Sequence, residues 1–403
     1  MATLSVTETI TWGIIYYGFP VFLRAMEDHL HASRVAVTGA FSVGMGITAL
    51  GALPVGRWLD RRGPWALMTL GSCLGTALLV AWTYVETLGG FYALWALFGV
   101  AMACTLYEPA FGAVVRWFPT HHRDRALTTV TLVAALASTI FMPIEAWLLL
   151  RFGWQRTLIT LAIILGATTI PLHAIVLRRQ PPPLAHRRGG EQTAAPVVSL
   201  TLGEATRTLL FWVLTIAFVV GNFSTISVTV HLIPYLTDRG WSPAVAAATI
   251  GWMGAMQIPG RVLFAGIASR LGSRVVTTGV FLAQAAGVAL VALVSVIPGG
   301  LIAVIVLLGA ANGMSTLARA TAVADVFGPR NYASISGAMA LGANGARAIG
   351  PVGASLLYVV LGHYESVFLT LGAALAVVGI AVGATEARAT AAAAETRSET
   401  SSS

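Results

Sequence analysis

Long apolar stretches separated by short polar turns dominate the chain. A helix that crosses a bilayer needs about 20 apolar residues, with a range of roughly 17–25. By this criterion each half of the chain contains six such stretches, and the pattern predicts an all-α integral membrane protein with twelve transmembrane helices. The predicted helices cover residues 8–28, 35–57, 65–85, 90–116, 125–150, 155–177, 209–236, 243–266, 274–297, 299–320, 332–360 and 365–386.

Two of the polar turns are related in sequence, at residues 56–64 and 265–274. The first turn carries four charged side chains, which are too costly to place in hydrocarbon, so it lies at a membrane surface. When the two stretches are aligned without a gap, identical residues coincide within both turns and in the helices before them. These pairs are Ser33 with Ser242, Gly51 with Gly260, Arg61 with Arg270, and Gly63 with Gly272. One helical hairpin is therefore used twice, and we expect two pseudo-symmetric six-helix bundles.

Composition supports the membrane class and indicates an orientation. Hydrophobic residues make up 57% of the chain and charged residues only 10%, against roughly 25% charged in soluble domains. All 24 basic residues are arginines, and they lie mainly in short loops between apolar stretches. That distribution fits membrane topology better than nucleic-acid binding, because positive residues favour the cytoplasmic side. With seventeen arginines on one predicted side and five on the other, we expect both termini in the cytoplasm of a multi-pass cell-membrane protein.

The domain boundaries follow from the same pattern. We expect an N-terminal bundle over 1–177 and a C-terminal bundle over 209–386. The connection at 178–208 is basic and rich in proline, which predicts a cytoplasmic linker. The tail at 387–403 is rich in Ala, Thr, Ser and Glu and has few large apolar side chains, so we expect it to be disordered.

The sequence contains no recognisable enzyme motif. It lacks a phosphate-binding Gly-Lys-Ser/Thr loop, a His-Glu-x-x-His pair and a Gly-x-Ser-x-Gly elbow. We therefore expect neither a catalytic site nor a cofactor, and no metal site. The expected partners are a small solute and membrane lipid, with no nucleic acid, and we expect a monomer.

Two arginines fall inside predicted helices, where a charge costs roughly 2.5–3.5 kcal/mol on insertion scales. Arg261 aligns with Ala52 in the first half, so the bundle architecture does not itself require a charge there. Arg347 lies near the middle of its helix, too deep to reach water easily. Each guanidinium has two interpretations, a group that binds an anionic substrate or a member of a structural ion pair. For Arg261, reaching along the helix to the cytoplasmic surface is a further alternative.

Other polar side chains inside the helices are candidates for the same solute path. Tyr16, Tyr17, Asn222, Asn312 and Asn344 are candidate substrate-binding residues. Each has the alternative of an ordinary interhelical hydrogen bond, and His231 is a further polar residue of this kind.

The first turn also carries a family signature. Gly56, Asp60, Arg61 and Gly63 stand in the pattern Gly-x-x-x-Asp-Arg-x-Gly, which resembles the motif between helices 2 and 3 of the major facilitator superfamily. The resemblance implies two six-helix bundles around a central substrate path. It also implies that these four residues form a gating motif that organises conformational change without touching substrate.

Two further stretches, 107–111 and 137–143, resemble the bacterial branch of that superfamily related to monocarboxylate transporters. Arg261, with a proline nearby, stands where those transporters carry their helix 8 arginine. Its combination with Arg347 resembles the paired cations of the oxalate transporter. The chain departs from the pattern at Gln257, where the monocarboxylate transporters have aspartate.

This departure disfavours a proton relay in helix 8 and directs attention to two other carboxylates. Glu108 lies toward the inner end of the fourth predicted helix, and Glu145 lies near the outer end of the fifth. A buried carboxyl group favours its protonated form, so either residue is a candidate for proton coupling. The alternatives are a charge pair between helices for Glu108 and a position in the headgroup region for Glu145.

These features predict a secondary transporter that moves a small organic anion, a mono- or dicarboxylate, by alternating access, and they leave open whether a proton is coupled to it. The alternative is a proton-coupled exporter of drugs or metabolites. Drug antiporters carry a glycine-rich run around a Gly-Pro pair in helix 5, whereas this chain has Ala-Ser-Thr-Ile-Phe-Met-Pro at 137–143. The sequence therefore favours the anion transporter.

Overall fold

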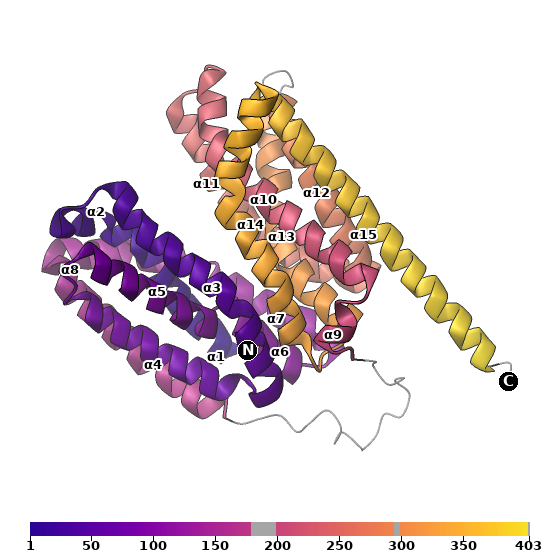
Figure 1. Cartoon of the computed structure of the whole chain (residues 1–403), viewed down its shortest axis with the longest axis horizontal. Helices are drawn as coiled ribbons and strands as arrows, with labels where there is room; N and C mark the ends of the chain where they lie inside the picture. The colour runs from indigo at the N-terminus through magenta and orange to yellow at the C-terminus, as the bar shows by residue number, and fades with distance from the viewer. Residues whose placement is uncertain (179–198, 294–298, 402–403) are drawn as a thin grey trace. The chain divides into compact units, whose positions relative to one another are not determined.

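Helices account for all the regular secondary structure that the computed structural model describes, over residues 1–178, 199–293 and 299–401 (Figure 1). A helix satisfies its backbone hydrogen bonds internally, which the bilayer interior requires because it offers no water. Eight helices or merged helices within these described residues are long and apolar enough to span a membrane by length and composition. One of them, at 122–176, contains two of the predicted spans, which separate at Gly153 where the backbone leaves helical geometry (φ 77°, ψ 169°).

The chain divides into two compact units. The first comprises Met1–Leu200 with Phe327–Leu341, and the second comprises Thr201–Val326 with Gly342–Ser403. The first unit contains the elements α1 (Ala2–Thr11), η1 (Trp12–Tyr17), α2 (Gly18–Leu30), α3 (Arg34–Arg62), α4 (Pro64–Trp82), α5 (Leu88–Thr105), α6 (Tyr107–Trp117), α7 (Thr120–Ala134), α8 (Ala137–Pro171) and η2 (Leu172–Val176).

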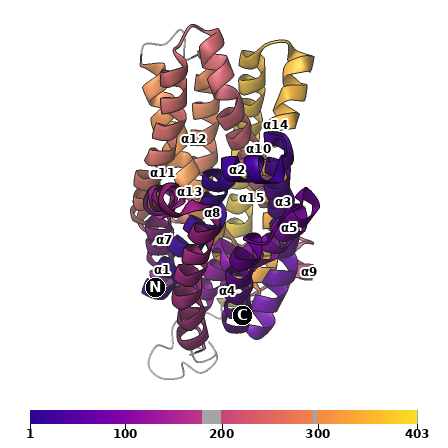
Figure 2. The same cartoon turned by 90° about the vertical axis from the view of Figure 1, so that its left-hand side faces the viewer.

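The remaining helices, which are labelled in Figure 2, belong wholly or mainly to the second unit. They are α9 (Leu202–Ala205), α10 (Leu209–Asp238), α11 (Pro243–Leu271), α12 (Ser273–Leu293), α13 (Gly300–Phe327), α14 (Tyr332–Leu361) and α15 (Tyr364–Ser401). The first residues of α14, up to Leu341, group with the first unit, so this helix is divided between the two.

The predicted helical hairpin repeat is confirmed in detail. Helices α3 and α11 each have 29 residues and begin after a serine whose hydroxyl caps the helix, Ser33 accepting from Ala36 N–H and Ser242 from Val245 N–H. Each helix ends at a glycine with positive φ, 77° at Gly63 and 81° at Gly272. Glycine adopts this conformation without steric cost. The two helices that align in sequence therefore also agree in length and in the residues that cap their two ends.

Glycine also brings the repeated helix close to a neighbour in each unit. A Cβ at Gly51 of α3 would lie 2.9 Å from the Ala103 Cβ of α5. A Cβ at the equivalent Gly260 of α11 would lie 2.2 Å from the Ala310 backbone oxygen of α13. Small residues let membrane helices pack backbone against backbone, and the same device is used at equivalent positions of both units.

Two predicted helices are broken or rewound near prolines. The fourth predicted span divides into α5 and α6 at Leu106, whose backbone is extended. Pro109 follows three residues later, and its ring would clash with the carbonyl of Thr105 in a continuous helix. In the first predicted span, residues 12–17 form the π-helical segment η1, three residues before Pro20. Such π-helical turns occur frequently at functional sites.

The connection and the tail differ from the sequence-based expectation. Residues 179–198 of the predicted linker lie outside the described residues, but its end forms the short helix α9. Thr201 and Glu204 cap this helix reciprocally, and the Thr201 N–H and hydroxyl lower the pKa of the exposed Glu204 carboxyl.

The tail predicted to be disordered instead continues α15 as helix to Ser401. Alanine, glutamate and arginine have high helix propensity, and this local preference outweighs the lack of apolar side chains.

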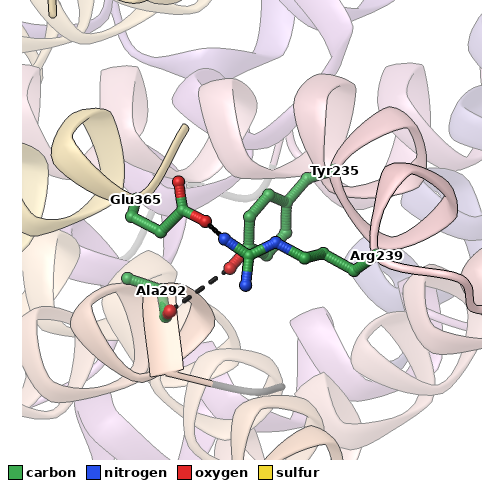
Figure 3. A network of polar contacts seen from close by, with 4 residues as sticks. All are labelled: Tyr235, Arg239, Ala292 and Glu365. Atoms are coloured by element: carbon green, nitrogen blue, oxygen red, sulfur yellow. Dashed lines mark hydrogen bonds and ion pairs between the residues drawn. The ribbon is translucent and has the colours of Figure 1, made fainter. Parts of the chain in front are cut away.

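One end of the second unit is held by a polar network (Figure 3). Arg239, at the end of α10, forms an ion pair with Glu365 in the first turn of α15. The guanidinium also lies over the ring of Tyr235, 5.2 Å from its centroid. The Tyr235 hydroxyl in turn donates to the Ala292 carbonyl of α12 at 3.2 Å. These contacts join α10, α12 and α15.

The close approach at Gly260 generates a stability prediction. Gly260→Ala would place a methyl group against the α13 backbone, which cannot rotate away, so we expect the free energy of unfolding in detergent to fall by about 1–3 kcal/mol. The matched control is Gly254→Ala in the same helix, where a Cβ meets no atom within 4 Å. The control should match or exceed the wild-type melting temperature, because alanine favours helix over glycine. Equal melting temperatures for the two variants would contradict the proposed helix contact.

Candidate substrate-binding, coupling and gating residues

Two predicted site residues meet in the second unit. The Arg347 Nε of α14 donates to the Asn222 Oδ1 of α10 at 2.5 Å, and the Asn222 Nδ2 donates to the Phe218 carbonyl at 2.8 Å. The amide is therefore anchored on its own helix and orients the guanidinium. Although Arg347 belongs to a predicted transmembrane helix, its side chain is exposed. The charge lies on an accessible face of the unit and not within its helix packing.

A second group of hydrogen bonds is centred on Asn312 of α13. Its Oδ1 accepts from Thr225 Oγ1 of α10 at 3.0 Å and from Gln284 Nε2 of α12 at 2.8 Å. Thr225 lies three residues after Asn222, so both project from the same face of α10. The two groups thus form a polar surface on α10 that meets α12, α13 and α14.

Arg261 lies elsewhere in the same unit and is much less accessible. Its residue is only 8% exposed, and the adjacent Gly260 is the point at which α11 approaches the α13 backbone. The contacts described for Arg347 are with α10, whereas the close packing around Arg261 is with α13. Burial rules out the expected alternative in which Arg261 extends to the cytoplasmic surface, because such an arginine keeps its head group in water.

Two other predicted polar residues of the second unit are also placed. Asn344 is half-buried on α14, three residues before Arg347 and therefore on the same face of that helix. His231 of α10 is nearly buried and lies within hydrogen-bonding distance of the Tyr364 hydroxyl (3.3 Å) and the Ser355 hydroxyl (3.4 Å). His231 is thus part of a network of its own toward the end of α10.

In the first unit, the predicted tyrosines belong to the π-helical segment η1. The Trp12 ring contacts Tyr16 and the Tyr107 ring, each with a centroid separation of 4.9 Å. Tyr16 also packs edge-on against Tyr17 at 5.0 Å. Both tyrosines are half-buried, so the segment presents a partly accessible aromatic surface with hydroxyl groups.

Glu108 has a defined hydrogen-bond donor. The Ser336 hydroxyl, in the part of α14 that belongs to the first unit, donates to Glu108 Oε2 at 3.0 Å. Glu108 also lies in the first turn of α6, because the helix break at Leu106 creates a new helix N-terminus there. Glu108 therefore accepts a hydrogen bond from a side chain of α14 within the first unit.

Glu145 of α8 is in the opposite situation. The residue is 0% exposed, and neither carboxyl oxygen has a hydrogen-bond partner among the residues that the structure describes. The expected alternative, a side chain that reaches the headgroup region, is therefore wrong, because the carboxyl group points into the packed interior of the first unit. Gly18, directly after η1, lies against it.

The gating motif makes a specific contact within the first unit. Asp60 Oδ1 accepts from Ala333 N–H at 3.0 Å, and Asp60 Oδ2 accepts from Ser334 N–H at 2.7 Å. These are N–H groups of the first turn of α14, which have no intrahelical partner. A carboxylate at this point also interacts favourably with the helix dipole. Asp60 of the motif thus supplies an external cap for α14.

The glycines and arginine of the motif support the same contact. A Cβ at Gly56 would lie 2.1 Å from the Ala333 oxygen, so glycine is required for α3 to approach α14. Gly63 ends α3 with its positive φ, and Arg61 is exposed in the last turn of that helix. Arg61 near a helix C-terminus has a favourable interaction with the dipole of α3.

Sequence reasoning missed three residues that the structure brings into these groups. Thr225 and Gln284 are neutral and gave no signal beyond being polar in apolar stretches. Glu8 of α1 is also fully buried, with one carboxyl oxygen accepting from Trp12 Nε1 at 3.1 Å. It lies at the beginning of the first predicted helix, where a charged residue is ordinarily at the membrane surface. Among the described residues, no group of three or more His, Cys, Asp or Glu could hold a metal ion.

Comparison with known proteins gives a consistent result. The family model described as Major Facilitator Superfamily matches residues 4–351. An "Oxalate:formate antiporter" of Oxalobacter formigenes is 28% identical over 245 residues, which is 59% of this chain and 54% of that protein. "Monocarboxylate transporter 13" of Bos taurus is 28% identical over 250 residues, which is 60% of this chain and 54% of that protein. The matched region thus spans only about half the length of these relatives.

Solved structures show the same fold. The Escherichia coli fucose:proton symporter superposes with a TM-score of 0.73 over 95% of this chain and 98% of that chain, at 15% sequence identity. At this identity the likeness concerns the fold alone, which is two six-helix bundles of the major facilitator type.

The Asp60 cap generates the next prediction. Asp60→Asn keeps one oxygen acceptor but turns an NH₂ group toward the second N–H of α14, so one buried donor loses its partner. We expect the free energy of unfolding in detergent to fall by about 0.5–2 kcal/mol, the range for loss of a helix cap. The control is Asp28→Asn at an exposed carboxylate of α2, which should change stability by less than about 0.5 kcal/mol. Equal stability of the Asp60 variant and wild type would show that the cap contributes nothing.

Proposed function

Because the chain belongs to the Major Facilitator Superfamily, we propose that it is a secondary transporter of a small organic anion, a mono- or dicarboxylate, that works by alternating access across the cytoplasmic membrane. The observation that carries this proposal is the exposed guanidinium of Arg347, oriented by Asn222 within the second unit. In this proposal both termini lie in the cytoplasm, as the distribution of arginines predicts.

The chemistry of Arg347 favours an anion with at least one carboxylate. A guanidinium carries a permanent charge and presents a planar fork that fits two carboxylate oxygens. Asn222 holds the Nε side of the group, so the plane of the fork is set before substrate arrives. Pre-organisation of this kind lowers the entropy lost on binding. A positive charge on an apolar helix is costly, and an anionic ligand offsets that cost.

Arg261 adds a second positive charge in the same unit. The buried guanidinium raises the local positive potential, which attracts anions and repels cationic drugs. The names of two relatives, an oxalate:formate antiporter and a monocarboxylate transporter, support the same class of substrate. Both arginines therefore favour the carboxylate transporter over an exporter of cationic drugs.

Neutral polar groups would complete recognition. Asn312 and Asn344 lie on the helices that carry or adjoin the Arg347 group, and we assign them to substrate hydrogen bonding. Tyr16 and Tyr17 are the corresponding candidates within the first unit, where their hydroxyls and rings suit a small, partly apolar carboxylate.

Conformational change in this proposal involves the Asp60 contact. The carboxylate holds the first turn of α14, and α14 continues into the second unit. We propose that these two hydrogen bonds break and re-form during the transport cycle. Gating elements of this kind bias a two-state equilibrium without contacting the ligand.

Substitution of the two arginines tests the proposal. Arg347→Lys keeps the charge but loses the fork, and we expect carboxylate affinity to fall about tenfold, equivalent to about 1.4 kcal/mol. Arg347→Ala or Arg261→Ala should cost about 2–5 kcal/mol of binding free energy. Binding is measured by titration of the detergent-purified protein with a panel that contains formate, acetate and oxalate.

Two controls separate binding from folding. Arg156→Lys changes an exposed arginine of α8 in the first unit and should leave affinity unchanged. Each variant must also elute as a single species with a melting curve like that of wild type. Wild-type affinity in the Arg261→Ala/Arg347→Ala double variant would contradict the anion site, whereas unfolding of either single variant would identify a structural ion pair.

A further inference from the structure

The carboxyl group of Glu145 is buried in the first unit, and no described residue forms a hydrogen bond with it. The residue is 0% exposed, and both of its oxygens lack hydrogen-bond partners in the described structure. Transfer of an ionised carboxylate into such surroundings is among the most costly changes in protein chemistry, and buried acids become neutral instead. The arrangement therefore requires a protonated Glu145.

The surroundings of Glu145 are closely packed. A Cβ at Gly18 would lie 3.1 Å from Glu145 Oε1, so the α2 backbone passes directly over the carboxyl group. Helix α8 packs against η1, α1, α2, α4 and η2. Those elements carry the titratable or charged side chains Glu8, Tyr16, Tyr17, Arg24, Glu27, Asp28, His29, Cys73 and His173. None of these side chains has a described hydrogen bond or ion pair with Glu145.

These contacts identify the ligand of Glu145 as a proton. A bound metal cation needs several oxygen ligands, and no second oxygen donor is described at hydrogen-bonding distance from this carboxyl group. An anionic solute is excluded because the side chain is inaccessible and would repel it when ionised. Glu108 and Glu8 differ, because Ser336 and Trp12 respectively donate hydrogen bonds to them.

We propose that Glu145 is the proton-binding residue that couples transport to the pH gradient, an inference that rests on the proposed carboxylate transport. With the carboxyl group packed against Gly18, the acid holds its proton. When η1 and α2 move away from α8, water reaches the carboxyl group, the O–H bond breaks and the proton passes to water, which leaves a hydrated carboxylate. The π-helical segment directly before Gly18 provides a place where the first helix can shift with little loss of backbone hydrogen bonding.

This arrangement links the proton to the charge of the substrate. One proton on Glu145 cancels one negative charge of the substrate. A monocarboxylate that crosses with this proton therefore moves no net charge, and its transport is independent of the membrane potential. Release of the proton requires the same helix movement that alternating access requires. Glu145 would therefore act away from the arginines, as a coupling residue and not as a substrate ligand.

Glu145→Gln is the decisive variant, because glutamine has nearly the shape of the protonated acid and should fold. In proteoliposomes loaded with unlabelled carboxylate, we expect the variant to exchange labelled carboxylate within about threefold of the wild-type rate, since exchange needs no net proton movement. When an inside-alkaline pH gradient is imposed, wild type should accumulate the carboxylate. The variant should reach only equal concentrations inside and outside.

The comparison variant is Glu108→Gln, which removes the other candidate acid. Loss of gradient-driven accumulation in Glu108→Gln, with accumulation retained in Glu145→Gln, would overturn the inference and leave the proposed function intact. If wild type exchanges no carboxylate at all, the proposed function fails, and the coupling role fails with it.

A spectroscopic measurement tests the protonated state without any substrate. The infrared difference spectrum between wild type and Glu145→Gln at neutral pH should contain the carbonyl stretch of a protonated carboxyl group. Its presence supports a buried neutral acid even if the transported solute is of another class. A difference spectrum that shows only carboxylate bands would overturn the inference.

Discussion

The absence of water from the bilayer interior is the constraint on which the rest of this structure depends. Every polar group placed there must find a partner within the protein, and most do. Threonine hydroxyls bond back to carbonyls of their own helices, as Thr105 does with Ala101 and Thr169 with Leu165. Larger polar groups pair between helices, as Arg347 does with Asn222. Among the described carboxyl groups, Glu145 is the one whose two oxygens are both buried without a hydrogen-bond partner, and such a costly placement is a reason to look for function.

The same constraint explains how the helices associate. Apolar side chains gain little by leaving lipid for protein, so close packing supplies the attraction between helices. Glycines at equivalent points of α3 and α11 allow such packing in both units, and the same applies to Gly372 and Gly379, which lie against α12 from α15. The duplicated hairpin is therefore retained where packing demands it. Where packing does not require the same residue, the two halves differ. Arg261 of the second half, for example, aligns with Ala52 of the first half.

Much of the fold could be predicted from the sequence because hydropathy and capping are local properties. The twelve spans, the hairpin repeat and the gating motif all follow from residues close together in the chain. Features that depend on tertiary packing could not be predicted in this way. The hydrogen bonds of Gln284 and Thr225 to Asn312 require knowledge of which helix faces meet. The depth of Glu145 depends on how α8 packs against η1 and α2, and the helical tail reflects a local propensity that composition alone obscured.

The central claim is that the chain transports small carboxylates. Its most direct test is uptake by proteoliposomes that contain the purified protein, across a panel of labelled formate, acetate and oxalate, a neutral sugar and a cationic dye. The arginines of the second unit predict saturable uptake of at least one carboxylate, inhibited by the other carboxylates and unaffected by the sugar or the dye. Saturable transport of the cationic dye, with no carboxylate taken up above the level of protein-free liposomes, would contradict the account.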